Sequence, residues 1–382
     1  MAVNVNLVAE RLLQARETLQ YSIDEASQAT GIAGERLVAI ESGREEPTGD
    51  DVLILASLYD CDFRSFLDQN SPPPVQQTDL LFRRYGETFS AEDRRATQEF
   101  LHLCHIEASL EQLLGIKRLL FSFRPSGSYV KAHGQHAAEA LRHQLGYKDN
   151  EVPRDVYTDF RAIGIHVFRR KLINDDISGL YVKDPVAGHC VLINYSEDVY
   201  RQRFSVAHEV AHAIFDSDKG VLLTYESKSG KYEAADLKEI RANSFASHFL
   251  MPLTMLKGLS TFDGESAKHW AQQFRVSTAA LAKALKDADL IGEAAAKRIR
   301  AVRVPRDDKI DPEAPEHLTV RQRERRKALL EHGLSNHYVD LCFKAHDRGL
   351  ISTGRLTEML RVDHAELPEI GALYGRTIGH GV

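Results

Sequence analysis

The residues with the clearest chemical potential are His208, Glu209 and His212, which form an HExxH pattern within RFSVAHEVAHAIF. The apolar residues around them recur at helical spacing, and positions i and i+4 of a helix lie on one face. Two imidazoles on one face can bind a single metal ion, while Glu209 can hold a water bound to that ion. The pattern therefore predicts a zinc site that activates water.

A catalytic zinc ion usually has three protein ligands and one position open to water, so a third ligand is expected. The best candidate is Glu239, which begins the helical segment EIRANSFASHFLMP. Glu239 and Asn243 share one face of this helix, and the buried side is expected to carry Leu237, Ile240, Phe245 and Phe249. Asp236 and Glu233 compete as ligands, although acidic residues at a helix start usually interact with the helix dipole.

The chemistry expected of such a site is amide hydrolysis. Zinc would acidify its water and polarise the scissile carbonyl, while Glu209 would take the water proton and pass it to the leaving amine. The developing oxyanion needs a further hydrogen-bond donor. Tyr225 and Tyr232 lie between the HExxH helix and the helical segment that contains Glu239, and both are candidate donors. A loop tyrosine is, however, more often a packing residue.

The elements expected to position these residues define a mainly α protein with a small β-sheet (α+β). GIHVFRR, SGLYVKD and HCVLINY alternate apolar and polar residues and predict three short strands. The second of them could bind an extended substrate by strand addition. Helical spacing predicts helices within residues 80–125 and over 134–145, and residues 217–236 are predicted to be a loop.

The N-terminal residues predict short helices separated by tight turns. Ser22 is a plausible N-cap, Gly31 ends the second helix, and a third helix begins near Ala33 and stops at Gly43. A fourth begins at about Asp50. This layout is that of a helix-turn-helix. The expected domains are a helix-turn-helix domain (1–69), a Pro-rich linker (70–79), a metallopeptidase domain with trailing helices (80–300) and a helical C-terminal domain (301–382).

Composition narrows the class of protein. The 382 residues are 43% hydrophobic and 27% charged, and no stretch approaches the roughly 20 apolar residues of a membrane span. Four cysteines without a CxxC pair argue against a disulfide framework and a thiolate zinc cluster. The N-terminus does not resemble a signal peptide, so we expect a cytoplasmic protein without a membrane partner.

Two resemblances add to this interpretation. Residues 131–252 resemble the ImmA/IrrE family of metallopeptidases in AAEALRHQLG, GIHV, ISGLYV, INY, RQRFSVAHEVAHAIF and EIRANSFASHFLMP. The resemblance implies a gluzincin-like domain, zinc bound by His208, His212 and Glu239, and Glu209 as general acid/base. His248 departs from it, since the family more often has a small or acidic residue there.

The N-terminal segment resembles the five-helix DNA-binding domain of phage repressors, the XRE or Cro/cI class. The matching residues are Gly31, Ile32, Leu37, Ile40, Glu41, Gly43 and Pro47. Residues 1–67 nevertheless contain five arginines and twelve acidic residues, a net charge of −7. Operator DNA would therefore be contacted through residues 20–45 by few cations, with Arg36 and Arg44 as candidates. The alternative is a dimerisation or partner-docking domain.

These features support two hypotheses. The first is a zinc-dependent, site-specific regulatory endopeptidase fused to a repressor-like domain, acting in transcriptional, stress, mobile-element or phage-defence regulation. The second is a DNA-binding regulator or antitoxin-like protein whose zinc domain senses or docks a partner without turnover. Glu209 favours the first, because a binding module does not need it, and the fused domain favours the second. In either case the expected partner is a protein, a repressor or a toxin, and a homodimer is possible.

Overall fold

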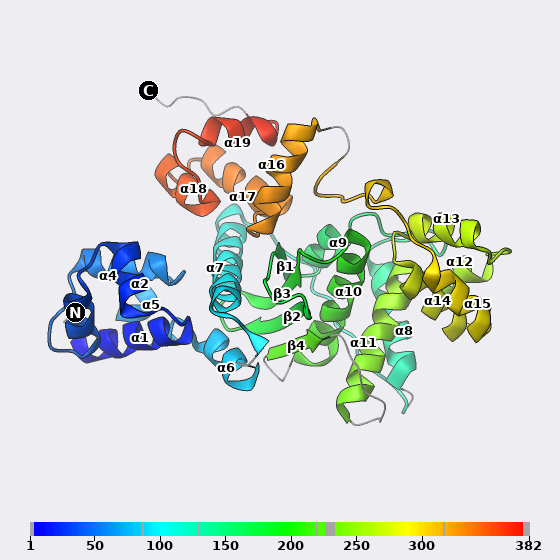
Figure 1. Cartoon of the computed structure of the whole chain (residues 1–382), viewed down its shortest axis with the longest axis horizontal. Coiled ribbons are helices and arrows are strands. Elements are labelled where there is room, and N and C mark those ends of the chain that lie inside the picture. Colours follow the sequence, from blue (N-terminus) through cyan, green and yellow to red (C-terminus); the bar gives the residue numbers. More distant parts are fainter. Residues whose placement is uncertain are drawn as a thin grey trace. The chain divides into compact units, whose positions relative to one another are not determined.

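The computed structural model describes residues 4–85, 88–128, 130–217, 221–225, 234–315 and 318–376. The chain forms two compact units, residues 1–106 with 172–174, and residues 107–171 with 175–382. The fold is mainly helical with one small sheet, as predicted (Figure 1). In the described part of the chain, none of the helices has the length and apolarity that crossing a membrane requires.

The first unit begins with the five helices that the sequence predicts. They are α1 (Val5–Thr18), α2 (Ile23–Thr30), α3 (Gly34–Glu41), α4 (Gly49–Leu58) and α5 (Arg64–Leu67). Ser22 and Glu25 form a reciprocal capping box at the start of α2, and Gly31 ends the helix with a φ of 75°. Leu12, Leu37 and Phe66 are fully buried in the core of this bundle.

Two further helices follow, α6 (Gln76–Tyr85) and α7 (Ala91–Leu114). Helix α6 begins inside the segment 70–79, which the sequence analysis interprets as a linker. Helical spacing predicts helices within residues 80–125, but α7 ends at Leu114, where Gly115 adopts a φ of 69°. Residues 115–128 contain no helix or strand.

The second unit contains a four-stranded sheet. Its strands are β1 (Ile165–Arg170), β2 (Ile177–Asp184), β3 (Gly188–Asn194) and β4 (Val221–Tyr225), in the order β1-β3-β2-β4. The first three lie where alternation predicted strands, whereas β4 lies in the predicted loop. Strand β4 pairs antiparallel with β2 and satisfies its backbone hydrogen bonds there. Because β3 and β4 occupy both edges of β2, the suggested addition of a substrate strand to β2 is wrong.

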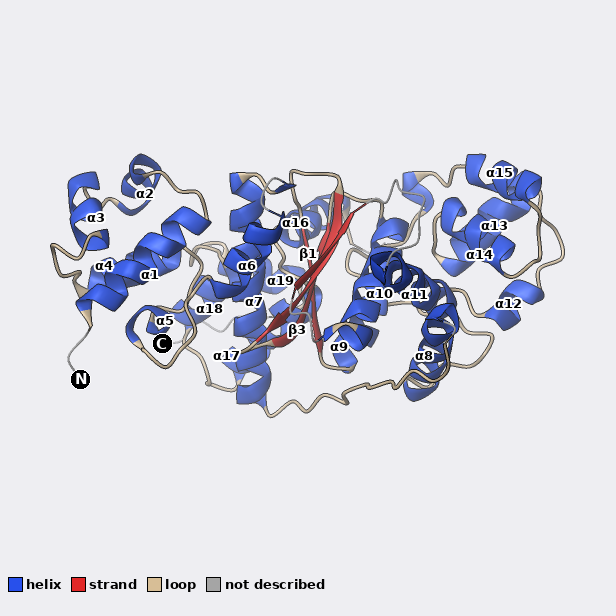
Figure 2. Ribbon diagram, turned by 90° about the horizontal axis from the view of Figure 1, so that it is seen from below, coloured by secondary structure: helices blue, strands red, loops and turns tan. Residues whose placement is uncertain are grey.

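Helices cover both faces of this sheet (Figure 2). On one face, Val167 of β1 packs into the core that includes α9 (Val156–Ala162), α10 (Val199–Phe215) and α11 (Ala234–Leu250). The next residue, Phe168, points to the other face and contacts Tyr338 of α17 (Asn336–Asp347). Helix α10 therefore lies against the sheet, which fixes the position of the HExxH segment.

Helix α8 (Val130–Gln144) packs closely against α11, and a glycine makes this approach possible. A Cβ atom at Gly134 would lie 2.3 Å from the backbone oxygen of Arg241, a distance that no side chain allows. Three helices then complete this side of the unit: α13 (Gly264–Phe274), α14 (Thr278–Asp287) and α15 (Glu293–Ala301), preceded by the short α12 (Leu253–Lys257). Their buried residues join the same core.

The C-terminal residues form α16 (Val320–Glu331), α17, α18 (Thr353–Leu360) and α19 (Leu367–Leu373) in the same compact unit as the sheet. Arg169 of β1 is buried and pairs with Asp311 and Glu313, each at 2.8 Å. Two arginines of α16 are used within these helices: Arg326 donates to the carbonyl oxygen of Leu373, and Arg325 pairs with Glu366. These contacts favour a structural role for the two arginines.

Candidate metal centre

Helix α10 presents the two histidines of the HExxH segment. Asp198 caps its start, and the apolar residues Val206 and Val210 anchor it in the core. His208 and His212 are 5% and 2% exposed, and their Nε2 atoms lie 3.1 Å apart. The i, i+4 spacing therefore brings both imidazole nitrogens to one point, as the sequence predicts.

Helix α11 brings Glu239 to the same point. Its Oε2 atom lies 3.1 Å from Nε2 of His208, and its Oε1 atom lies 3.4 Å from Nε2 of His212. One ligand atom from each of the three residues lies within 4.8 Å of the others. The Glu239 side chain is 44% exposed, so the cluster opens to solvent on this side.

The donor set fits a divalent metal ion. Ligand atoms held about 2.1 Å from a tetrahedral zinc ion lie about 3.4 Å from one another. The separations of 3.1 to 3.4 Å among the three side chains match this value. Two imidazole nitrogens and a carboxylate are also lone-pair donors, whose mutual repulsion is relieved by a cation between them. His208, His212 and Glu239 could therefore hold zinc.

Two residues that the sequence analysis missed position His212. Its Nδ1 atom hydrogen-bonds to Asp216 at 3.1 Å, and Asp216 accepts from Arg241 at 2.9 Å. This arrangement places the imidazole proton on Nδ1 and leaves Nε2 available for a metal. Asp216 is four residues after His212 and caps the C-terminal end of α10, so the i, i+4 spacing could have identified it.

These contacts also set the protonation of the metal-free cluster. Burial opposes the charged form of His212, but hydrogen bonds to Asp216 and Glu239 outweigh it and raise its pKa to about 9. Burial likewise opposes the charged carboxylate of Asp216, yet His212 and Arg241 hold its pKa at about 2. A cationic group at His212 is thus favoured whenever no metal occupies the cluster.

Glu209 is fully buried beside the two histidines. Its Cγ atom lies against β2, where a Cβ atom on Gly179 would be 3.1 Å away. Glycine at this position leaves room for the glutamate side chain. The charge of Glu209 contributes to the raised pKa of His212, which places the carboxylate within electrostatic reach of the cluster.

The remaining candidates fall elsewhere. Tyr225 ends β4, but its side chain is outside the described residues, as are Tyr232 and Glu233. Asp236 lies in the first turn of α11, and Glu239 is the α11 carboxylate that meets the histidines. Nδ1 of His248 donates to the carbonyl oxygen of Ser244, 2.8 Å away, one helical turn before it. Leu237, predicted to be buried, is 43% exposed.

A second group of metal-ligand type residues lies in the same unit. Glu107, Glu111 and His166 are buried, and one ligand atom from each lies within 4.8 Å of the others. Nδ1 of His166 lies 2.8 Å from Glu107, and Glu111 pairs with Arg118 through Nε at 3.1 Å. His337 lies 3.6 Å from Glu111.

The candidate DNA contacts differ in their surroundings. Arg36 pairs with Glu45 and with Asp51, the latter at 2.5 Å, so its guanidinium is held by acids of its own domain. Arg44 is exposed, and its Nε atom donates to Ser42 at 2.8 Å. Of the two arginines, Arg44 is therefore the one more available to a phosphate.

Two segments of the chain match known protein families. Residues 160–286 match the peptidase family described as the IrrE N-terminal-like domain, and residues 12–66 match a helix-turn-helix family. His208, Glu209, His212 and Glu239 all lie in the first match. No curated protein matches the chain. The chain thus fuses a helix-turn-helix domain to an IrrE N-terminal-like domain, as the sequence resemblance implied.

Proposed function

We propose that the IrrE N-terminal-like domain is a zinc-dependent endopeptidase that cleaves a specific regulatory protein. The observation that carries this proposal is the convergence of His208, His212 and Glu239 on one point beside the buried Glu209. A binding site for zinc alone has no need of a second carboxylate at this position. The match to a peptidase family supports the same conclusion.

The residues of this chain divide the work of amide hydrolysis. Zinc, when bound by the three ligands, supplies positive charge that acidifies water and polarises a carbonyl group. Glu209 accepts the proton as water adds to the scissile carbonyl, and delivers it to the amine as the C–N bond breaks. Asp216 and Arg241 keep the His212 ring in the orientation that binds the metal.

A comparison of cellular N-termini tests this proposal. We would express the wild-type chain and the Glu209→Gln variant in the native host and identify new protein N-termini by mass spectrometry. The glutamine can hydrogen-bond to water but cannot take its proton, so a small set of cleavages should appear only with the wild type. Identical N-termini in both strains would contradict turnover and favour the sensing or docking alternative.

We further propose that the helix-turn-helix domain directs the protein to operator DNA upstream of its own gene. The match over residues 12–66 and the exposed Arg44 support this role. The protein would bind as a homodimer, because helix-turn-helix repressors read two half-sites. The full chain should shift its upstream DNA at low salt, and Arg44→Ala should weaken the shift more than Arg36→Ala. No shift at micromolar protein would leave a partner-docking domain.

A further inference from the structure

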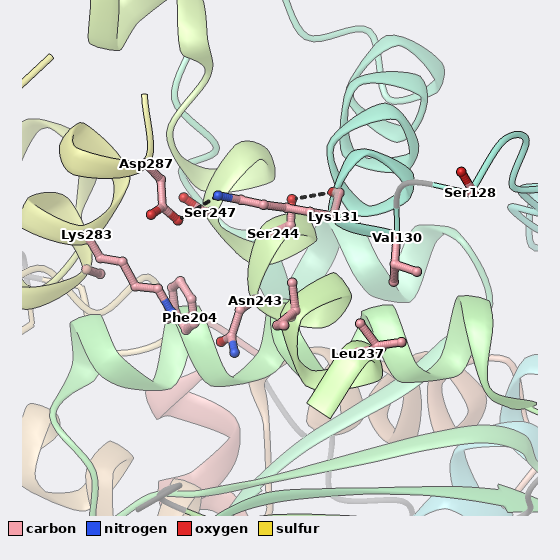
Figure 3. A pocket seen from close by; sticks show the side chains of 12 residues that line it. Ser128, Val130, Lys131, Phe204, Leu237, Asn243, Ser244, Ser247, Lys283 and Asp287 are labelled. Atoms are coloured by element: carbon pink, nitrogen blue, oxygen red, sulfur yellow. Dashed lines mark hydrogen bonds and ion pairs between the residues drawn. The ribbon is translucent and has the colours of Figure 1, made fainter. Parts of the chain in front are cut away.

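A pocket of about 550 Å³ lies between α8, α10, α11 and α14 (Figure 3). Its walls are mainly apolar and include Val130, Phe204, Leu237, Ile240 and Ala280. The volume is in the range of pockets that hold small ligands or side chains. The exposure of Leu237 has an explanation here, because its side chain lines this pocket rather than the core.

The pocket adjoins the candidate metal centre. Phe204 precedes His208 by four residues on α10, and Asn243 follows Glu239 by four residues on α11. Residues four apart share one helix face about one turn, or about 5 to 6 Å, from each other. Both Phe204 and Asn243 line the pocket, so it begins about one helical turn from the metal ligands.

The charged side chains that line the pocket, Lys131, Lys283 and Asp287, carry a net positive charge. Lys131 and Asp287 form an ion pair at 3.2 Å and balance each other. Lys283 extends from α14 toward Phe204 and Asn243, which Figure 3 shows. Its ammonium group adds positive charge next to the apolar walls. A lysine or arginine side chain entering the pocket would therefore meet a like charge in partly apolar surroundings.

We propose that this pocket binds a large uncharged apolar side chain of the polypeptide held at the metal centre, and that Lys283 excludes basic side chains. The inference rests on the proposed function, because it takes the occupant to be the substrate. Apolar walls one helical turn from the ligands can receive a side chain next to the bond that is cleaved. Phe204, Ile240 and Ala280 would then set the size of the side chain.

Hydroxamates of single amino acids test this assignment, because the hydroxamate group binds zinc and the side chain can enter the pocket. We would titrate the zinc-loaded full-length protein with the hydroxamates of glycine, norleucine and lysine by calorimetry. Norleucine hydroxamate should bind at least about tenfold more tightly than glycine hydroxamate, since each buried methylene contributes affinity. Lysine hydroxamate, which has the same stem with an ammonium group, should lose this advantage.

Two variants test whether the side chain of the hydroxamate binds in this pocket. Ala280→Trp should fill the pocket, so that norleucine and glycine hydroxamates bind equally while glycine hydroxamate binds as it does to the wild type. The unchanged affinity for glycine hydroxamate also reports that this variant is folded. Lys283→Met changes an exposed residue and should improve the binding of lysine hydroxamate several-fold, leaving glycine hydroxamate unaffected.

The outcomes separate this inference from the proposed function. Equal binding of glycine and norleucine hydroxamates to the wild type would overturn the pocket assignment and leave the metal centre intact. A norleucine preference that survives in Ala280→Trp would place the side chain elsewhere and also overturn it. If glycine hydroxamate fails to bind the zinc-treated wild type, the metal centre itself is contradicted, and both proposals fall with it.

Discussion

Two clusters in the second unit meet the same geometric criterion for a metal site, yet they differ in how their charges are balanced. In the first, His208, His212 and Glu239 converge, while Arg241 of α11 pairs with Asp216 behind them. In the second, Arg118 pairs directly with Glu111, beside Glu107 and His166. In the first cluster the arginine pairs with a carboxylate behind the three ligand-type side chains, whereas in the second it pairs directly with one of them.

The pKa shifts show how the charges of the second cluster are balanced. Burial opposes the charged forms of Glu107 and His166, but their mutual hydrogen bond outweighs it, lowering the pKa of Glu107 and raising that of His166. Burial also opposes the charge on Glu111, but His337 and Arg118 bring its pKa to about 2. The second cluster is thus a set of internal ion pairs. Proximity of ligand-type residues does not define a metal site unless their charge is left for a metal to balance.

The largest effect is expected within the first cluster, at Glu209. Glu209→Gln should lower the rate of substrate cleavage by about 10²- to 10⁴-fold, the usual contribution of a general acid/base. Zinc content and thermal unfolding should stay at wild-type values, because Glu209 is not a ligand. A variant that loses zinc along with activity would show that Glu209 holds the metal.

The next largest effect is a difference in stability between variants of the two clusters. Glu107→Ala removes one partner of a buried ion pair and should lower the free energy of unfolding by about 3–5 kcal/mol. Glu239 is 44% exposed, so Glu239→Ala should change the stability of the zinc-free protein much less. Urea denaturation of both variants, in the presence of a chelator, measures the difference. Equal losses would contradict the assignment of a structural role to the second cluster alone.

A smaller effect is expected at the residue that orients His212. Asp216→Asn keeps a hydrogen-bond acceptor for Nδ1 but removes its negative charge, and should weaken zinc binding about 10- to 100-fold. Competition with a chromophoric chelator measures the affinity. Asp340→Asn, an exchange at a surface carboxylate of α17, is the matched control. If both variants bind zinc like the wild type, the contact between Asp216 and His212 does not tune the site.

The smallest effect concerns pH. The pKa of about 9 at His212 means that the metal-free imidazole carries a proton below that pH, and zinc must displace it. Zinc affinity should therefore rise with pH up to about 9, by about tenfold per pH unit for one displaced proton. Chelator competition at several pH values gives the slope. An affinity that does not change with pH would mean that His212 is already neutral.

Much of this arrangement could be predicted from local pattern. The i, i+4 histidines and the helical period of residues 239–252 placed His208, His212 and Glu239 on facing helices, and the structure brings these side chains together. Ser22 and Gly31 likewise mark the ends of α2 because capping depends on residues next to each other in sequence. Features that depend on residues close together in the sequence could therefore be predicted from the sequence alone.

Features that depend on distant contacts could not. Strand β4 is only five residues long and forms because the edge of β2 accepts it. Leu237 has an apolar side chain at helical spacing, but it lines the pocket between α8, α10, α11 and α14 and stays exposed. The second cluster joins residues 107, 111 and 166, whose charges meet only through packing in the folded unit. Local periodicity contains no signal for such pairings.

The most direct test of the central claim is the zinc content of the purified full-length protein and of two variants. One oxygen of the buried Glu107 carboxylate has no hydrogen-bond partner among the described residues, so the second cluster is the alternative site that this measurement has to exclude. We predict about one zinc ion per chain in the wild type, none in Glu239→Ala and about one in His166→Gln. Two ions per chain, zinc retained in Glu239→Ala, or zinc lost in His166→Gln would contradict the assignment of the metal centre to His208, His212 and Glu239.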